Sequence, residues 1–124
     1  MNKKNKIVNQ KIDLIQKELH EKEDELLDLF KREREIESIE DTLRGLEQRK
    51  QETLILMQNV YQGSKSRGLT QHMLEAGQED SRNFSRLINS LKEENQTTKS
   101  TLNHRKASLV ETKNGLEKEL LLND

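Results

Sequence analysis

Apolar residues recur along the first half of the chain in alternating steps of three and four residues. This spacing places them on one stripe of an α-helix, as in the seam of a coiled coil. Continued through its polar gaps, the stripe includes Lys22, Glu33 and Lys50. Two successive steps of three, at Glu33, Ile36 and Ile39, predict a locally overwound coil. The apolar members are Val8, Ile12, Ile15, Leu19, Leu26, Leu29, Ile36, Ile39, Leu43, Leu46, Leu54, Met57 and Val60.

The rhythm stops at Tyr61, and the glycines and serines that follow predict a loop near residues 62–68. Gly63 is expected to adopt the left-handed conformation that ends a helix. A second periodic stretch begins near Leu69. Its apolar members are Met73, Ala76, Phe84, Leu87, Ile88, Leu91, Leu102, Leu109, Leu116 and Leu120, and Asn95, Thr98, Arg105 and Thr112 fall on the same stripe.

The two periodic stretches have matched lengths around a short loop, which favours an antiparallel hairpin. We therefore expect an all-α fold, a long two-helix antiparallel coiled-coil hairpin that forms a single domain over residues 1–124. Helix one is predicted at about 4–61 and helix two at about 69–122. Folding the chain about residue 65 pairs Leu46 with Phe84, Leu43 with Leu87, Ile39 with Leu91 and Lys50 with Asp80.

The composition agrees with a narrow seam, because 30% of the residues are hydrophobic and 36% are charged. A two-helix seam buries little area, so apolar residues outside it predict a second buried surface, either in a dimer or against helices of a partner. The residues that widen the stripe are Leu14, Leu27, Phe30, Ile55, Leu56, Leu74 and Val110. The candidates for partner contact are Leu26, Leu27, Phe30 and Ile39 in helix one and Phe84, Ile88 and Leu91 in helix two.

Little in the sequence predicts chemistry. There is no Cys, and His20, His72 and His104 are scattered, so no metal site, cofactor or enzyme activity is expected. No pocket is expected between two helices. The net charge of -1 and the scarcity of aromatic residues give no support to nucleic-acid binding. No apolar run approaches a membrane span or the core of a signal peptide, which predicts a cytoplasmic protein.

At the turn, the order Tyr61-Gln62-Gly63 resembles the Trp-x-Gly turn of small helical hairpins exported by type VII secretion systems. The whole chain resembles the helical accessory proteins encoded beside LXG toxins in Gram-positive bacteria. That resemblance implies that Tyr61, Gly63 and Gly68 set the turn. It also implies binding to the helical N-terminal domain of the toxin, often with a second small helical protein, and targeting of the complex to the secretion system. Tyr61 replaces the Trp of that family, and the chain lacks a Tyr-x-x-x-Asp/Glu export signal after helix two. Export would then occur together with the toxin.

Two other classes of protein share the charge, the length and the seam. The stalk-like proteins of type III secretion and flagellar export are also two-helix antiparallel coils, and a generic homodimeric coiled-coil scaffold has the same pattern. An accessory protein and a stalk differ in their partner, a toxin in one case and a secretion ATPase in the other.

Overall fold

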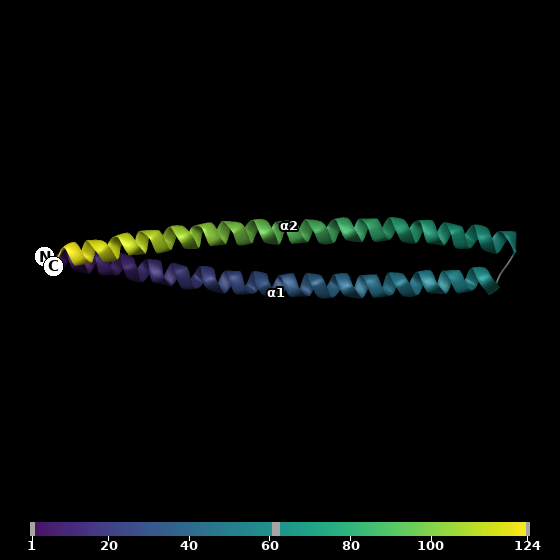
Figure 1. Cartoon of the computed structure of the whole chain (residues 1–124), viewed down its shortest axis with the longest axis horizontal. Coiled ribbons are helices and arrows are strands. Elements are labelled where there is room, and N and C mark those ends of the chain that lie inside the picture. The colour runs from purple at the N-terminus through teal and green to yellow at the C-terminus, as the bar shows by residue number, and fades with distance from the viewer. Residues whose placement is uncertain (1, 61–62, 124) are drawn as a thin grey trace. The chain divides into compact units, whose positions relative to one another are not determined.

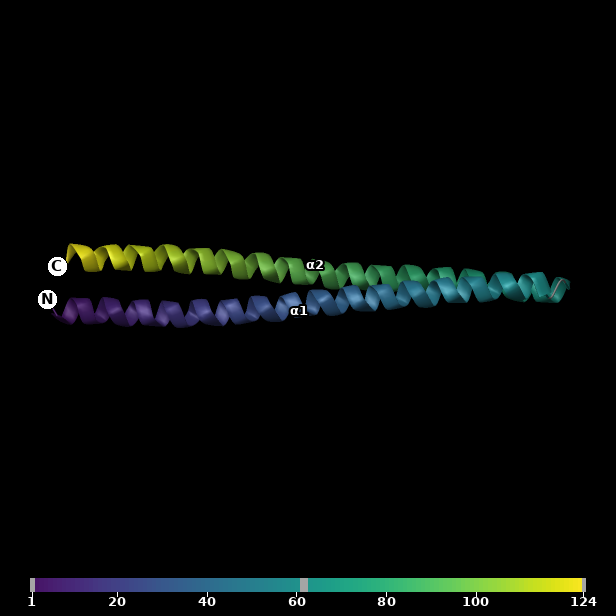
Figure 2. The ribbon, with the colours of Figure 1, turned by 60° about the horizontal axis from the view of Figure 1, so that its bottom comes forward.

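The computed structural model is an all-α hairpin, which confirms the predicted fold class (Figure 1). It describes residues 2–60 and 63–123, with side chains at all of these except 2 and 64–66. Helix α1 spans Asn2–Val60 and helix α2 spans Ser64–Leu122, and the two lie side by side in opposite directions (Figures 1 and 2). The sequence suits such helices because it has no Pro and is rich in Leu, Glu and Lys.

The turn between the helices is shorter than the sequence suggests, because α2 begins at Ser64 and not near Leu69. The amide of Arg67 donates a hydrogen bond of 3.0 Å to the carbonyl of Gly63. That bond is the first of α2, so Gly63 acts as its N-cap residue, a position that glycine tolerates well. No glycine among the described residues has a positive φ, and the expected left-handed conformation of Gly63 is therefore wrong. Gly68 lies inside α2.

Contacts divide the hairpin into two compact units, and each unit contains part of both helices. We call Met1–Arg32 together with Asn95–Asp124 the terminal unit, and Glu33–Glu94 the turn-side unit. Nothing in the sequence pattern predicts this division within the expected single hairpin.

The seam of the terminal unit is apolar on α1, where Val8, Ile12 and Leu29 are at most 8% exposed. From α2, Leu102 and Leu109 are buried to a similar degree. These residues confirm the predicted stripe, since each falls at a step of three or four from the next seam position.

The polar members of the α2 seam differ from the expected ones. Thr98, Arg105 and Thr112 are exposed, and the partly buried residues are the lysines that follow them, Lys99, Lys106 and Lys113. A lysine fits at the edge of a seam because its aliphatic stem covers apolar neighbours while the ammonium group reaches water. The Nζ of Lys106 lies 3.5 Å from Glu23 Oε1 on α1. Exposed Arg105 donates to Glu18 Oε1, with Nη2 at 2.9 Å and Nε at 3.0 Å.

The turn-side unit has fewer buried apolar residues. Ile36 and Leu54 of α1 and Ile88 of α2 are at most 9% exposed. Thr70 is 3% exposed, and Gly77 and Ser81 also lie on the seam of α2. Small and polar residues thus occupy seam positions of α2 that apolar residues would normally fill.

Candidate functional site

The α1 seam of the turn-side unit keeps an unbroken alternation of three and four, and this overturns the predicted overwinding. Ile39 is 53% exposed, and Glu40 takes the seam position next to it. Leu46 is 55% exposed, and Glu47 is the partly buried residue. An unbroken heptad rhythm avoids the local overwinding that two successive steps of three would impose.

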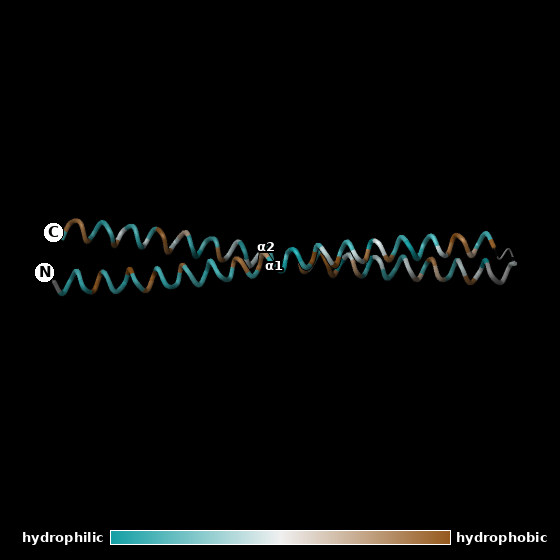
Figure 3. Tube along the Cα trace, turned by 90° about the horizontal axis from the view of Figure 1, so that it is seen from below, coloured by the Kyte–Doolittle hydropathy of each residue, from teal (hydrophilic) through white to brown (hydrophobic). Residues whose placement is uncertain are grey.

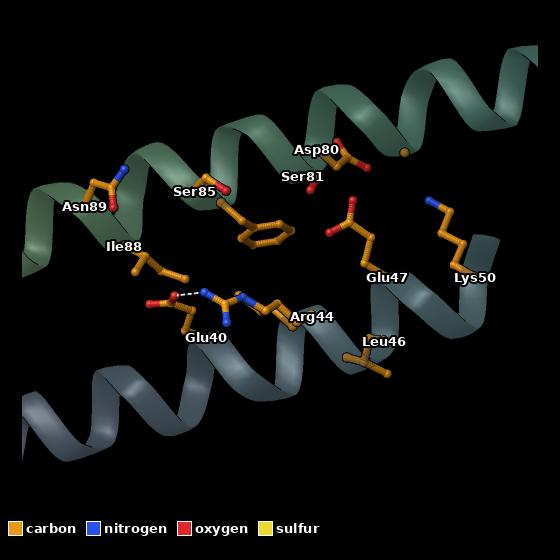
Figure 4. Close-up of a pocket in the computed structure, with 13 residues that line it drawn as sticks. Glu40, Arg44, Leu46, Glu47, Lys50, Asp80, Ser81, Ser85, Ile88 and Asn89 are labelled. Carbon is orange, nitrogen blue, oxygen red and sulfur yellow. Dashed lines mark hydrogen bonds and ion pairs between the residues drawn. The ribbon is translucent and has the colours of Figure 1, made fainter. Parts of the chain in front are cut away.

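Glu40 tolerates the seam because two cations surround its carboxylate. Lys92 of α2 forms an ion pair with Glu40 across the seam. Arg44, one turn further along α1, forms a second, which Figure 4 shows. The hydrogen bond from Lys92 lowers the pKa of the Glu40 carboxyl below its usual value. Partial burial opposes this shift, and the charges of Lys92 and Arg44 add to it. A seam glutamate is therefore kept ionised and paired.

The small residues of α2 leave a groove between the helices. Its volume is about 510 Å³, and Gly77, Ser81 and Ser85 of α2 line it together with Phe84 and Lys50. The expectation that two helices form no pocket is therefore wrong. In Figure 4, Lys50 and Glu47 of α1 point toward α2.

Lys50 and Asp80, which the sequence predicted to pair, both lie at this groove but do not contact each other as an ion pair, although the structure describes both residues. The Lys50 Nζ instead lies 3.1 Å from the place where a Cβ would stand on Gly77. The level of Lys50 on α1 therefore corresponds to the level of Gly77 on α2.

Ile39 and Leu46, which lie outside the α1 seam, belong to a second stripe on the outside of the helix that combines apolar residues with two threonines and one arginine. It runs from Ile39 to Val60 in alternating steps of three and four, and all its members are exposed. We call it the outer stripe of α1. It consists of Ile39, Thr42, Leu46, Arg49, Thr53, Leu56 and Val60.

The threonines of this stripe have already satisfied their hydroxyl donors. Thr42 Oγ1 donates to the carbonyl of Ser38 at 2.9 Å, and Thr53 Oγ1 donates to the carbonyl of Arg49 at 2.8 Å. Because each donor has a partner within the helix, covering these side chains leaves no hydroxyl hydrogen unpaired. Arg49 is the only charged residue of the stripe.

Helix α2 carries an equivalent outer stripe in the same unit. It runs from Leu69 to Ser90 in the same alternating steps, and every member is exposed. Leu69 is 59% exposed, Met73 38% and Leu87 57%. The full stripe is Leu69, Met73, Ala76, Asp80, Asn83, Leu87 and Ser90, in which Asp80 is the only charge.

The two outer stripes lie on the same side of the hairpin. On each helix the stripe includes the residue just before a seam residue, such as Ile39 before Glu40 on α1 and Leu87 before Ile88 on α2. Antiparallel helices are related by a local two-fold axis perpendicular to their common plane, and this axis leaves equivalent positions on one side. The two stripes therefore make one continuous surface, which we call the outer face.

The opposite side of the turn-side unit is polar. On α1 it carries Arg34, Glu37, Asp41, Arg44, Gln48 and Gln51, with Ile55 as an exposed exception, and on α2 it carries Gln71, Glu75, Gln78, Arg82, Ser85 and Asn89. Figure 3 shows how apolar and polar residues alternate along both helices. The contrast between the two sides distinguishes the outer face from scattered surface apolar residues, which are normal on any protein.

The residues predicted to contact a partner separate by burial. In the turn-side unit, Ile39, Phe84 and Leu91 are 38–53% exposed and Ile88 is buried. In the terminal unit, Leu27 and Phe30 are exposed, while Leu26 is partly buried in the seam. Of the turn residues, Gly63 caps α2 and Gly68 is helical, and Tyr61 lies outside the described residues.

Sequence reasoning missed several members of the outer face because it placed them in the seam. Leu46, Val60, Met73 and Leu87 were expected inside the hairpin, and all are exposed. Leu56 was recognised as lying outside the seam, and it is 63% exposed. The sequence does contain a signal for this arrangement. Glu40 and Glu47, which follow Ile39 and Leu46, continue the alternation of three and four without a break, and this indicates that the glutamates hold the seam positions.

Among the described residues, no cluster of His, Asp and Glu side chains could hold a metal ion. Within the same part of the chain, neither helix has a stretch apolar enough to cross a membrane. Comparisons of the chain with protein-family models, with curated proteins and with solved structures found no match.

Proposed function

We propose that this protein acts without catalysis, by binding helices of a partner protein through the outer face of its turn-side unit. The partner we propose is the helical N-terminal domain of a secreted LXG toxin, which the protein would help to target to a type VII secretion system. The exposed apolar stripes on one side of the hairpin support the binding role. The choice of toxin rests on the resemblance at Tyr61-Gln62-Gly63 and on the size and charge of the hairpin.

The spacing of the outer face favours a helical partner. Steps of three and four let a facing helix insert its side chains between those of each stripe, as in coiled coils and helical bundles. An extended peptide would instead require a free sheet edge or a groove with alternating pockets. Two parallel stripes side by side offer room for two helices of the partner, which would complete a bundle.

Each exposed leucine of the outer face can contribute usefully to binding. Full burial of such a side chain is worth about 1.5–3 kcal/mol, and Leu46 is already close to half buried. Covering the rest should add about 1 kcal/mol. Placing a charge there would cost more than this gain, because the carboxylate would be desolvated without a partner.

The test is co-purification of the full chain with the N-terminal domain of an LXG toxin whose gene neighbours that of this protein. We expect a stable complex from the wild-type protein. Leu46→Glu should weaken it by at least about tenfold, a loss of about 1.4 kcal/mol. Phe84→Asp, at the groove beside the outer face, should do the same. Far-UV circular dichroism should remain helical in both variants, because neither residue is buried in the seam.

Ile55→Glu is the matched control. Ile55 is 53% exposed, close to the 55% of Leu46, but it lies on the polar side of the hairpin. Binding should survive this change. If Leu46→Glu and Ile55→Glu weaken the complex equally, the outer face is not the binding surface. If the wild-type chain stays free in the presence of the toxin domain, the proposed function is wrong.

A further inference from the structure

The outer face carries two opposite charges at nearly the same level of the hairpin. Arg49 directly precedes Lys50, whose Nζ reaches Gly77, and Asp80 lies about one turn beyond Gly77. Both charged residues are exposed, and neither forms an ion pair within the described part of the chain. Whatever covers this face must neutralise both, because an unpaired charge is costly to remove from water.

We propose that a second copy of this chain covers the outer face, so that the turn-side units of two copies form a four-helix bundle. A two-fold axis parallel to the helices sets α1 of one copy against α2 of the other, at the same level and in the opposite direction. Arg49 of each copy then faces Asp80 of the other copy. The two-fold axis repeats the contact between Arg49 and Asp80, so the four charged side chains of the dimer form two pairs of opposite sign.

The spacing of the two stripes supports this pairing along their whole length. The outer stripe of α1 read forward and that of α2 read backward have the same order of steps, so every residue of one stripe has a counterpart in the other. The level that joins Arg49 to Asp80 also joins Ile39 to Ser90, Thr42 to Leu87, Leu46 to Asn83, Thr53 to Ala76, Leu56 to Met73 and Val60 to Leu69. Apolar residues meet apolar or small residues at most levels, and no like charges meet.

The dimer does not depend on the proposed toxin partner. It uses the same face, so a toxin domain that binds there would have to displace the second copy. Before the toxin domain binds, the second copy would keep the apolar stripes covered from water. This order of events makes the two proposals separable, since dimerisation is measured on the chain alone and toxin binding is measured in a mixture.

The experiment is sedimentation velocity of the full chain alone, from about 1 to about 200 μM. The wild-type protein should form a dimer within this range. In Arg49→Asp, two aspartates face each other at both contacts of the dimer, and in Asp80→Arg two arginines do. Each variant should raise the dissociation constant of the dimer by at least about tenfold. An equimolar mixture of these two variants should regain the dimer, because both cross-chain pairs are then of opposite sign. An ion pair inside one chain would not produce that recovery.

Ile55→Glu should dimerise like the wild type, and Leu46→Glu should not. Far-UV circular dichroism checks that all variants remain helical. A wild-type chain that is monomeric at every concentration overturns the proposal. A dimer that is insensitive to both charge reversals, or a mixture of the two variants that stays monomeric, overturns it as well.

Discussion

Asn95 is a buried polar residue whose replacement should stabilise the protein. It lies on the α2 seam of the terminal unit and is 9% exposed, and its side-chain Nδ2 has no hydrogen-bond partner. A buried donor left unpaired costs about 1–3 kcal/mol. Asn95→Leu removes that cost and adds buried apolar area, and repacking around the larger side chain offsets part of this gain. We expect a net stabilisation of about 2 kcal/mol.

Urea unfolding followed by circular dichroism measures this change at a fixed protein concentration. A gain of about 2 kcal/mol corresponds to a rise of about 8 °C in Tm for a chain of this size. Asn103→Leu is the matched control, since Asn103 is on the same helix but exposed, and it should change stability by less than about 0.5 kcal/mol. A neutral or destabilising Asn95→Leu would show that the buried amide is not a liability, and the reasoning would fail.

Three further predictions concern the turn-side unit. Gly77→Ala should stabilise α2 by about 0.5–1 kcal/mol, because alanine favours a helix and the new Cβ would meet only the flexible end of the Lys50 side chain. Gly45→Ala, whose new Cβ would meet no atom within 4 Å, should stabilise α1 by a similar amount, and thermal unfolding measures both changes. Because the pKa of Glu40 is lowered from 4.5, its ion pair with Lys92 should stabilise the fold at neutral pH, and this contribution should be lost as the pH falls below 4.5. In urea unfolding measured at several pH values, Glu40→Gln should therefore reduce the loss of unfolding free energy at acid pH. Ile88→Ala should cost about 2–3 kcal/mol of unfolding free energy, because Ile88 is 7% exposed, and an unchanged urea midpoint would place it outside the seam.

Periodicity predicted the fold class and much of the seam. Val8, Ile12, Leu29, Leu54, Leu102 and Leu109 are buried as expected. Each of these residues continues the alternation of three and four, so spacing identifies it as a seam residue even where an apolar neighbour such as Phe30, Ile55 or Val110 follows it.

The turn-side unit shows where that method fails. Ile39 and Leu46 lie beside Glu40 and Glu47, and hydrophobicity alone favours the apolar residue of each pair. The structure chooses the glutamate at each place because the heptad rhythm then continues, and Lys92 from the other helix neutralises Glu40. Local spacing gives no information about a cation that comes from a distant part of the chain. The partner-binding candidates were therefore only partly separated from the seam.

The start of α2 could not be predicted either. Glycine and serine near residues 63–68 are typical of a loop, yet the same residues are acceptable in the first turn of a helix. The hydrogen bond from Arg67 to Gly63 decides between the two. Tertiary packing over a long hairpin outweighs the weak local preference of Gly68.

The lysines in the seam of the terminal unit also determine which helices can pair. Lys99, Lys106 and Lys113 follow one another at intervals of seven residues on α2, and Glu23 of α1 forms an ion pair with Lys106. If two α2 helices from different chains paired in parallel and in register, each lysine would face its own copy, and the repulsion would repeat at every heptad. Such parallel pairings between chains during folding are thereby disfavoured relative to the antiparallel pairing of α2 with α1.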